Sequence, residues 1–167
     1  MASGLFIDPL TLLRVVPLVT STASIVIAGD SDLFLSALLS LKQHRGKVNE
    51  IAPRYFEVFF WKGLRYILLT YGLSATCGLV NAYSRSHAAA SWNWYAAGSV
   101  LALAHFAFVP KIMWKVKDAI DAKEEPNGGA ANALRGWLAV HHVRTALVDV
   151  PSWACFLVAT VKALKSI

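Results

Sequence analysis

The sequence predicts an all-α protein, an integral membrane four-helix bundle that runs up-down-up-down with both termini on the same side. Hydrophobic residues make up 56% of the 167 residues and charged residues only 16%, whereas soluble domains are closer to a quarter charged. The apolar residues gather in separate blocks divided by polar stretches, which is typical of a polytopic membrane protein. Because the connections are short, successive helices are expected to be antiparallel.

We expect a single membrane domain, residues 1–167, with spans at about residues 9–28, 55–83, 92–114 and 131–164. The sequence GDSD at residues 29–32 is expected to interrupt the first helix, and residues 42–54 to form a polar loop. Pro53 suits the start of the second helix. Residues 85–90 are predicted to form a short turn, and residues 126–129, PNGG, the strongest break in the chain.

The residues that flank the spans predict the orientation of the bundle. Trp92, Trp94 and Tyr95 resemble an interfacial aromatic belt, with Trp114 near the other end of the third span. Basic residues concentrate in the first and third connections, which are therefore expected in the cytoplasm: Lys42, Arg45, Lys47, Arg54, Lys115, Lys117 and Lys123. We expect an integral protein of the endoplasmic reticulum or another endomembrane. The net charge of +6 is not taken as nucleic-acid binding, because the charges lie between apolar blocks.

The fourth span is the most informative segment, because ionisable side chains interrupt an otherwise apolar helix. On a helical projection, two neighbouring stripes hold the polar and aromatic side chains: Trp137, His141, Arg144, Arg135, His142 and Asp149. The opposite half is apolar and is expected to meet lipid: Ala139, Val140, Val143, Ala146, Leu147 and Val150. Ionisable groups are costly at membrane depth, so they usually face the bundle interior and mark a working site.

These residue types support proton transfer and anion stabilisation. Histidine moves protons near neutral pH, and arginine stays charged and holds an oxyanion. We therefore expect catalytic roles for the following residues: His141, Arg144, His142 and Asp149. Asp149 is too far from His142 for contact along one helix, so its expected role is to neutralise a cation on a neighbouring helix: Arg14, Lys62 or Arg65.

Further polar and aromatic side chains are expected to bind a lipophilic small-molecule substrate: Trp137, His105, Asn132, Trp61 and Arg65. Trp61 and Arg65 share one face of the second span. His105 alone is typical of a satisfied core histidine, but with His141 or His142 it would form a metal or haem ligand pair. The chain has no established metal-ligand spacing, and we assign no metal.

The sequence WxxxHxVRT at residues 137–145 resembles the last-helix signature of the anthrone-oxygenase-like family of small fungal membrane proteins. Asn132, shortly before the tryptophan, and residues 108–110, FVP, are also similar to that family. The similarity spans most of the chain, including its length and its apolar blocks.

The resemblance implies a polyketide-tailoring enzyme that converts an anthrone to an anthraquinone with dioxygen and no cofactor. His141 would remove a proton from the methylene carbon, and Arg144 would stabilise the enolate oxygen, with assistance from His142 and Asp149. The electron-rich carbanion would then reduce dioxygen directly. A membrane cavity suits both the flat aromatic substrate and the dissolved gas.

Two alternatives stay open. One is a membrane epoxide hydrolase or cyclase, in which Asp30, Asp32 or Asp149 activates the nucleophile and Arg144 or a histidine protonates the leaving oxygen. The other is a non-enzymatic haem-binding or scaffold protein. The expected partners are a lipophilic substrate and the lipid bilayer, without nucleic acid. Small polytopic bundles often associate, so a homo-oligomer is also considered.

Overall fold

The structure, a computed structural model, describes residues 8–84 and 91–165. The turn predicted at residues 85–90 lies outside the described residues. Every regular element within them is helical. The first long stretch is α1 (Pro9–Ser40), and the short turn η1 (Lys42–His44) joins it to the second, α2 (Arg45–Tyr83).

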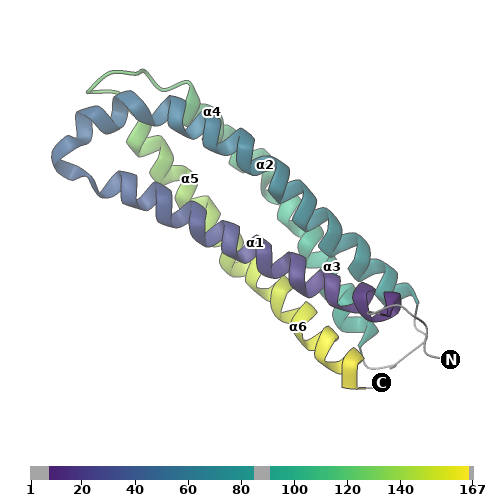
Figure 1. The fold of residues 1–167 in the computed structure, drawn as a ribbon. Coiled ribbons are helices and arrows are strands. Elements are labelled where there is room, and N and C mark those ends of the chain that lie inside the picture. The colour runs from purple at the N-terminus through teal and green to yellow at the C-terminus, as the bar shows by residue number, and fades with distance from the viewer. Residues whose placement is uncertain (1–7, 85–90, 166–167) are drawn as a thin grey trace.

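The third and fourth long stretches are each interrupted by an irregular turn. The third consists of α3 (Trp92–Ala104), η2 (His105–Phe108) and α4 (Val109–Ile120). The fourth consists of α5 (Ala130–Arg144), η3 (Thr145–Asp149) and α6 (Val150–Lys165). Figure 1 shows that the stretches alternate in direction along an elongated bundle. The start of α1 and the end of α6 lie at the same end, and the prediction of an all-α four-helix architecture is confirmed.

Three helical stretches are long and apolar enough to cross a membrane: Pro9–Ser40, Trp92–Ile120 and Ala130–Leu164. This is consistent with a membrane protein. α2, which contains the span expected at residues 55–83, is not among them. Polar side chains interrupt its second half as well, including Thr70, Ser74 and Asn81, although Leu68, Leu69 and Val80 are exposed there.

Two expected helix breaks are absent from the structure. α1 continues through residues 29–32, where Ser31 bonds back to the carbonyl of Ile27 and so stays compatible with the helix. Pro53 lies inside α2 rather than at its start, and most of the loop expected at residues 42–54 is helical. Burial of Val48, Ala52 and Phe56 in the core stabilises this extension of α2, because tertiary packing overrides local composition.

The aromatic residues at the start of α3 have two different roles. Trp92 and Trp94 are exposed, as an interfacial belt requires. Tyr95 is buried instead, and its hydroxyl donates to the carbonyl of Arg14 at 2.8 Å. Tyr95 is therefore a core residue that ties α3 to α1, and its assignment to the belt was wrong.

Each irregular turn ends two residues before a proline. η2 precedes Pro110, and η3, a π-helical turn, precedes Pro151. Proline has no N–H and clashes with the carbonyl four residues back, so the helix must adjust locally. Val109 donates to Phe106, three residues back, and Val150 donates to Thr145, five residues back. The two adjustments change which side chains point inward.

Candidate functional site

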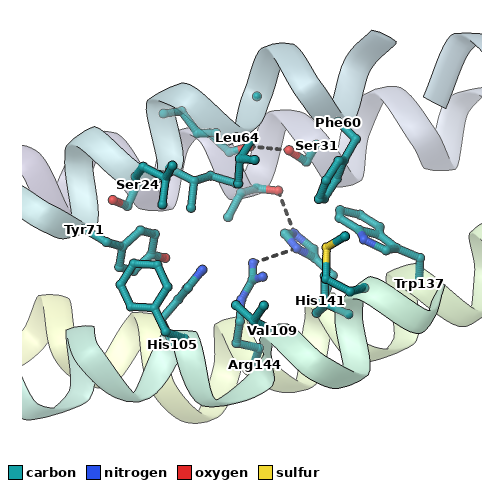
Figure 2. Close-up of a pocket in the computed structure, with 18 of the residues that line it drawn as sticks. Ser24, Ser31, Phe60, Leu64, Tyr71, His105, Val109, Trp137, His141 and Arg144 are labelled. Atoms are coloured by element: carbon teal, nitrogen blue, oxygen red, sulfur yellow. Dashed lines mark hydrogen bonds between the residues drawn. The ribbon is translucent and has the colours of Figure 1, made fainter. Parts of the chain in front are cut away.

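A cavity of about 370 Å³ lies inside the bundle and receives side chains from all four helical stretches. Most of its lining is apolar, and its volume is within the range of small-molecule pockets. Figure 2 shows Tyr71 and His105 at one end and Phe60 and Trp137 at the other, with Arg144 and His141 between them. The polar or amphipathic lining side chains are Ser24, Ser31, Trp61, Tyr71, His105, Trp137, His141 and Arg144.

Four buried side chains form a continuous hydrogen-bonded row beside this cavity. Arg144 donates from Nη2 to Nδ1 of His141 at 2.9 Å and from Nε to Oδ2 of Asp149 at 3.2 Å. The other oxygen of Asp149 lies 2.9 Å from Nδ1 of His105. A buried carboxylate between a guanidinium and an imidazole is compensated in both charge and hydrogen bonds, which is the condition for burying it.

The contacts of His141 define its tautomer. Nε2 lies 3.1 Å from the carbonyl of Ala28, which can only accept, so Nε2 carries the proton. Nδ1 accepts from Arg144. Protonation of Nδ1 would direct two donors at each other, so this arrangement favours neutral His141 with both nitrogens occupied. In this geometry His141 orients Arg144 and has no free lone pair for a substrate proton.

His105 has the opposite arrangement. Its Nδ1 donates to the ionised Asp149, which leaves Nε2 as the basic nitrogen. No described residue makes a hydrogen bond to Nε2, and the side chain lines the cavity. A carboxylate that fixes one ring nitrogen and leaves the other free for a proton is the arrangement of a general base. The ring of Tyr71 packs against the imidazole at a tilt of 35°, with the centroids 3.8 Å apart.

The π-turn η3 explains how Arg144 and Asp149 come together. We expected Asp149 to neutralise Arg14, Lys62 or Arg65, and that expectation was wrong. Its cationic partner is Arg144, five residues earlier on the same stretch. The extra residue in a π-turn brings side chains five apart onto one face. Pro151, two residues after Asp149, was the sequence signal for this turn.

Trp137 closes the other end of the polar row. Its ring stacks on His141, with centroids 4.8 Å apart and planes 13° apart, and its edge meets Phe56. Its Nε1 is buried and makes no hydrogen bond with any described residue. An unpaired buried donor is costly, so a ligand oxygen placed there would stabilise the occupied site.

Several predicted site residues lie away from this row. His142 is exposed on the outer side of α5 and bonds Asp32 at 2.7 Å. Asn132 accepts from Arg45 and Arg135 near the start of α5. Neither residue, nor the exposed Arg65, lines the cavity, whereas Trp61 does. His142 was grouped with Asp149 only because a regular helix was assumed.

The structure also places the carboxylates and histidines on which the alternative predictions depend. None of the three carboxylates, Asp30, Asp32 and Asp149, lines the cavity. Asp149 belongs to the polar row through its bonds to His105 and Arg144, whereas Asp32 bonds the exposed His142. His105 and His141 both line the cavity, but both ring nitrogens of His141 have hydrogen-bond partners, so His141 offers no free nitrogen to a metal or haem. Within residues 8–84 and 91–165, no three His, Cys, Asp or Glu side chains gather as a metal site would require.

Comparison with known proteins relates the chain to fungal biosynthetic proteins over nearly its whole length. It is 26% identical to an epoxidase, pydX, of an Acremonium species, over 93% of this chain and 96% of that protein. It is 26% identical to the epoxidase gkaX of Penicillium citrinum, over 93% and 96% of the two chains. It is 27% identical to the oxaleimides biosynthesis cluster protein N of Penicillium oxalicum, over 94% and 92%.

No family model matches the sequence, and no solved structure matches it. The relatives support the expected link to small fungal proteins of secondary metabolism. Two of these three relatives are named epoxidases, and none of the three is named an anthrone oxygenase. The chain is therefore similar to fungal epoxidases, and these relatives suggest an oxidative tailoring enzyme.

Proposed function

We propose that this protein is a membrane-embedded enzyme that oxidises a lipophilic, polyketide-type small molecule with dioxygen. The observation that carries the proposal is the buried row His141, Arg144, Asp149 and His105 beside a largely apolar cavity. The cavity suits an apolar substrate, and the row supplies a base and a fixed cation. The names of the relatives favour oxidation among the reactions that such a row supports.

The first step is removal of a proton from an acidic carbon of the substrate. His105 Nε2 accepts the proton, and Asp149 stabilises the resulting imidazolium through Nδ1. This assigns the base to His105 and gives His141 the task of orienting Arg144. Trp137 and Trp61 contact the apolar body of the substrate.

Arg144 stabilises the negative charge that develops on the substrate oxygen. Its Nη2 and Nε are held by His141 and Asp149, whereas Nη1 has no hydrogen-bond partner among the described residues. A guanidinium held in place before reaction binds an enolate without reorganisation, which is how electrostatic catalysis operates in a dry site. The charge of Asp149 keeps this cation compatible with burial.

The carbanion then transfers electrons to dioxygen, and a carbon–oxygen bond forms. Protonation of the peroxide by the imidazolium gives a hydroperoxide and regenerates the base. With an anthrone, loss of water from that hydroperoxide gives the quinone, so the reaction balances without an external reductant. Dioxygen is the co-substrate, and the proposal uses no resident cofactor.

The second candidate is formation of an epoxide on a substrate alkene. The observation that favours it is the name of the relatives, which are called epoxidases. An epoxide retains one atom of dioxygen, so this reaction requires two electrons from a co-substrate or from another carbon of the substrate. The apolar cavity suits a polyene as well as an aromatic ring system.

Labelled dioxygen tests the proposal and separates the two candidates. Protein in lipid nanodiscs is supplied with ¹⁸O₂ and either an anthrone or a lipophilic alkene that carries an acidic carbon. We expect ¹⁸O in the product, as a quinone from the anthrone or as an epoxide from the alkene. Product at the spontaneous rate from both substrates, or product that forms equally well without dioxygen, would contradict the proposal.

A further inference from the structure

We infer that the membrane surface crosses the bundle at the level of the cavity, and that the cavity opens sideways there to an amphiphile with an apolar body and one polar oxygen end. The substrate class rests on the proposed function and deepens it. The position of the membrane surface does not depend on catalysis. It follows from where the charged and apolar side chains lie on the outer surface.

One set of charged or ionisable side chains encircles the bundle, with members on each long stretch, and is called the charged girdle: Asp30, Asp32, Lys62, Arg65, Lys111 and His142. The bond of His142 to Asp32 puts α5 and α1 in register at this level. None of the six lines the cavity. Five of the six are exposed and Asp32 is half-buried, and a hydrocarbon environment would be costly for exposed charges.

Contacts between helices fix the remaining levels. The hydrogen bonds Thr20–Ser74 and Ser24–Thr70 give the antiparallel register of the two helices. A step of four residues forward along α1 matches a step of four residues back along α2. The same register puts Asp30 and Asp32 level with residues 64 and 62. On the other side, Gly136 faces the side chain of Lys115, so that Lys111 lies close to the level of residue 140.

Between the charged girdle and the end of the bundle that holds the start of α1, the lengths of the four helical segments match the thickness of a bilayer. They are residues 9–30, 65–83, 92–111 and 142–162. At 1.5 Å per residue these segments span about 27–32 Å, and a hydrocarbon core is about 30 Å thick. The length of the α2 segment agrees as well, although α2 is not among the helices that are apolar enough to cross a membrane by composition.

The surfaces of these segments have the composition that lipid requires. Their exposed side chains include Val19, Val26, Leu68, Leu69, Val100, Leu147 and Val161. At the lower boundary Trp94 is exposed, and the ammonium of Lys162 lies 5.8 Å from the centre of its ring. Trp61 and Tyr66 are exposed near the girdle. Aromatic residues therefore mark both boundaries, as is typical of interfacial belts.

The mouth of the cavity lies between α2 and α4. The cavity-lining residues that are also exposed are Trp61, Leu68, Val109 and Met113. Gly63 also lines the cavity, and a side chain there would meet no atom within 4 Å. An apolar body can therefore enter from the lipid side, while its oxygen end stays near the polar membrane surface until it meets Arg144.

Spin-label accessibility tests the position of the membrane surface. Val58 and Leu69 are both apolar residues of α2, 53% and 58% exposed, on opposite sides of the girdle. In a Cys77→Ala/Cys155→Ala background, Val58→Cys and Leu69→Cys are labelled and reconstituted into phosphatidylcholine vesicles. We expect a soluble nickel chelate to relax the label at position 58, and dissolved oxygen to dominate at position 69. The same behaviour at both positions would overturn the inference.

The natural cysteines provide a second measurement that needs no substitution. Cys77 and Cys155 are free thiols within the membrane segments. A membrane-impermeant charged maleimide should leave both unmodified in intact and in freeze-thawed vesicles, and should react after denaturation. Rapid modification in vesicles would contradict the assigned membrane segments.

The lateral mouth is tested by filling it. Gly63→Leu is compared with Gly72→Leu, because both glycines lie on α2 with open space beside them and only Gly63 lines the cavity. The ligand is 2-hydroxyanthracene, and anthracene is the control without a polar end. Saturable fluorescence binding should weaken roughly tenfold or more in Gly63→Leu, as expected when a pocket is filled.

Gly72→Leu should bind 2-hydroxyanthracene like the unmodified protein. Equal binding by the two variants would exclude the mouth between α2 and α4, and equal saturable binding of anthracene would exclude the amphiphile. Neither measurement involves turnover. Failure here is therefore distinguishable from failure of the oxidation proposed above.

Discussion

Arg144 and Asp149 are five residues apart on one helical stretch, yet Nε of the arginine donates to Oδ2 of the aspartate at 3.2 Å. In a regular α-helix, side chains five apart point about 140° away from each other. The π-turn Thr145–Asp149 brings both side chains to the interior. The contact of Asp149 with His105 then joins the guanidinium to the base.

Replacing Pro151 tests this use of the π-turn. Pro151→Ala restores an N–H for the carbonyl of Leu147, which favours a regular helix and turns Asp149 away from Arg144. We expect turnover to fall roughly 10- to 100-fold, because small misplacements of catalytic groups cost that much. Pro53→Ala, which changes a proline inside α2 away from the cavity, controls for the loss of a proline. Full activity of Pro151→Ala would show that catalysis does not depend on the π-turn.

Asp149→Asn preserves the size of the side chain and removes its charge. We expect kcat to fall about 10²- to 10⁴-fold, because His105 loses the carboxylate that stabilises its protonated form. Breaking a buried ion pair also costs about 3–5 kcal/mol, so the thermal midpoint in detergent should drop. Asp32→Asn is the matched control, because that carboxylate bonds the exposed His142. The idea fails if both substitutions have the same effect on kcat.

A glutamine scan assigns the base. The amide introduced by His141→Gln can accept from Arg144 and donate to the carbonyl of Ala28, so it preserves both contacts of the imidazole. We expect this variant to retain activity within about tenfold, whereas His105→Gln should lose about 10²- to 10⁴-fold. Initial rates measured at saturating substrate provide the comparison. The reverse order would return the base to His141.

The packing of the lower bundle gives a stability prediction. A Cβ on Gly78 would clash with Ser99 and lie 2.7 Å from Phe156, a fully buried residue of α6. Gly78→Ala should therefore destabilise the protein by about 1–3 kcal/mol, as overpacking does. Gly72→Ala has open space and should be neutral or stabilising by up to about 1 kcal/mol. Thermal unfolding in one detergent compares them, and equal midpoints would contradict the packing.

The inward side of the last stretch could be predicted from its sequence, because helical periodicity separates polar from apolar side chains. His141 and Arg144 are buried, and Val143 and Leu147 are exposed, as expected. Val140, which was expected to meet lipid, is buried in the core instead. The position of His142 could not be predicted correctly from a uniform helix. The π-turn breaks the seven-residue relationship between His142 and Asp149 and leaves His142 outside.

The hydrogen-bond partners could not be read from the sequence. His141 bonds the carbonyl of Ala28, 113 residues earlier in the chain, and Asp149 bonds His105, 44 residues earlier. Both contacts depend on how separate helices pack. His105 alone is typical of a core histidine, and only the approach of Asp149 distinguishes it as the residue with a free, basic nitrogen.

Hydrogen exchange without oxygen is the most direct test of the central claim, which is that His105 and Asp149 remove a proton from a carbon acid in the cavity. An anthrone is incubated anaerobically with the protein in D₂O, and deuterium in its methylene group is followed by mass spectrometry. The account predicts exchange well above the spontaneous rate with the unmodified protein and near that rate with His105→Gln. Exchange at the spontaneous rate by protein that still oxidises the same anthrone under oxygen would contradict it.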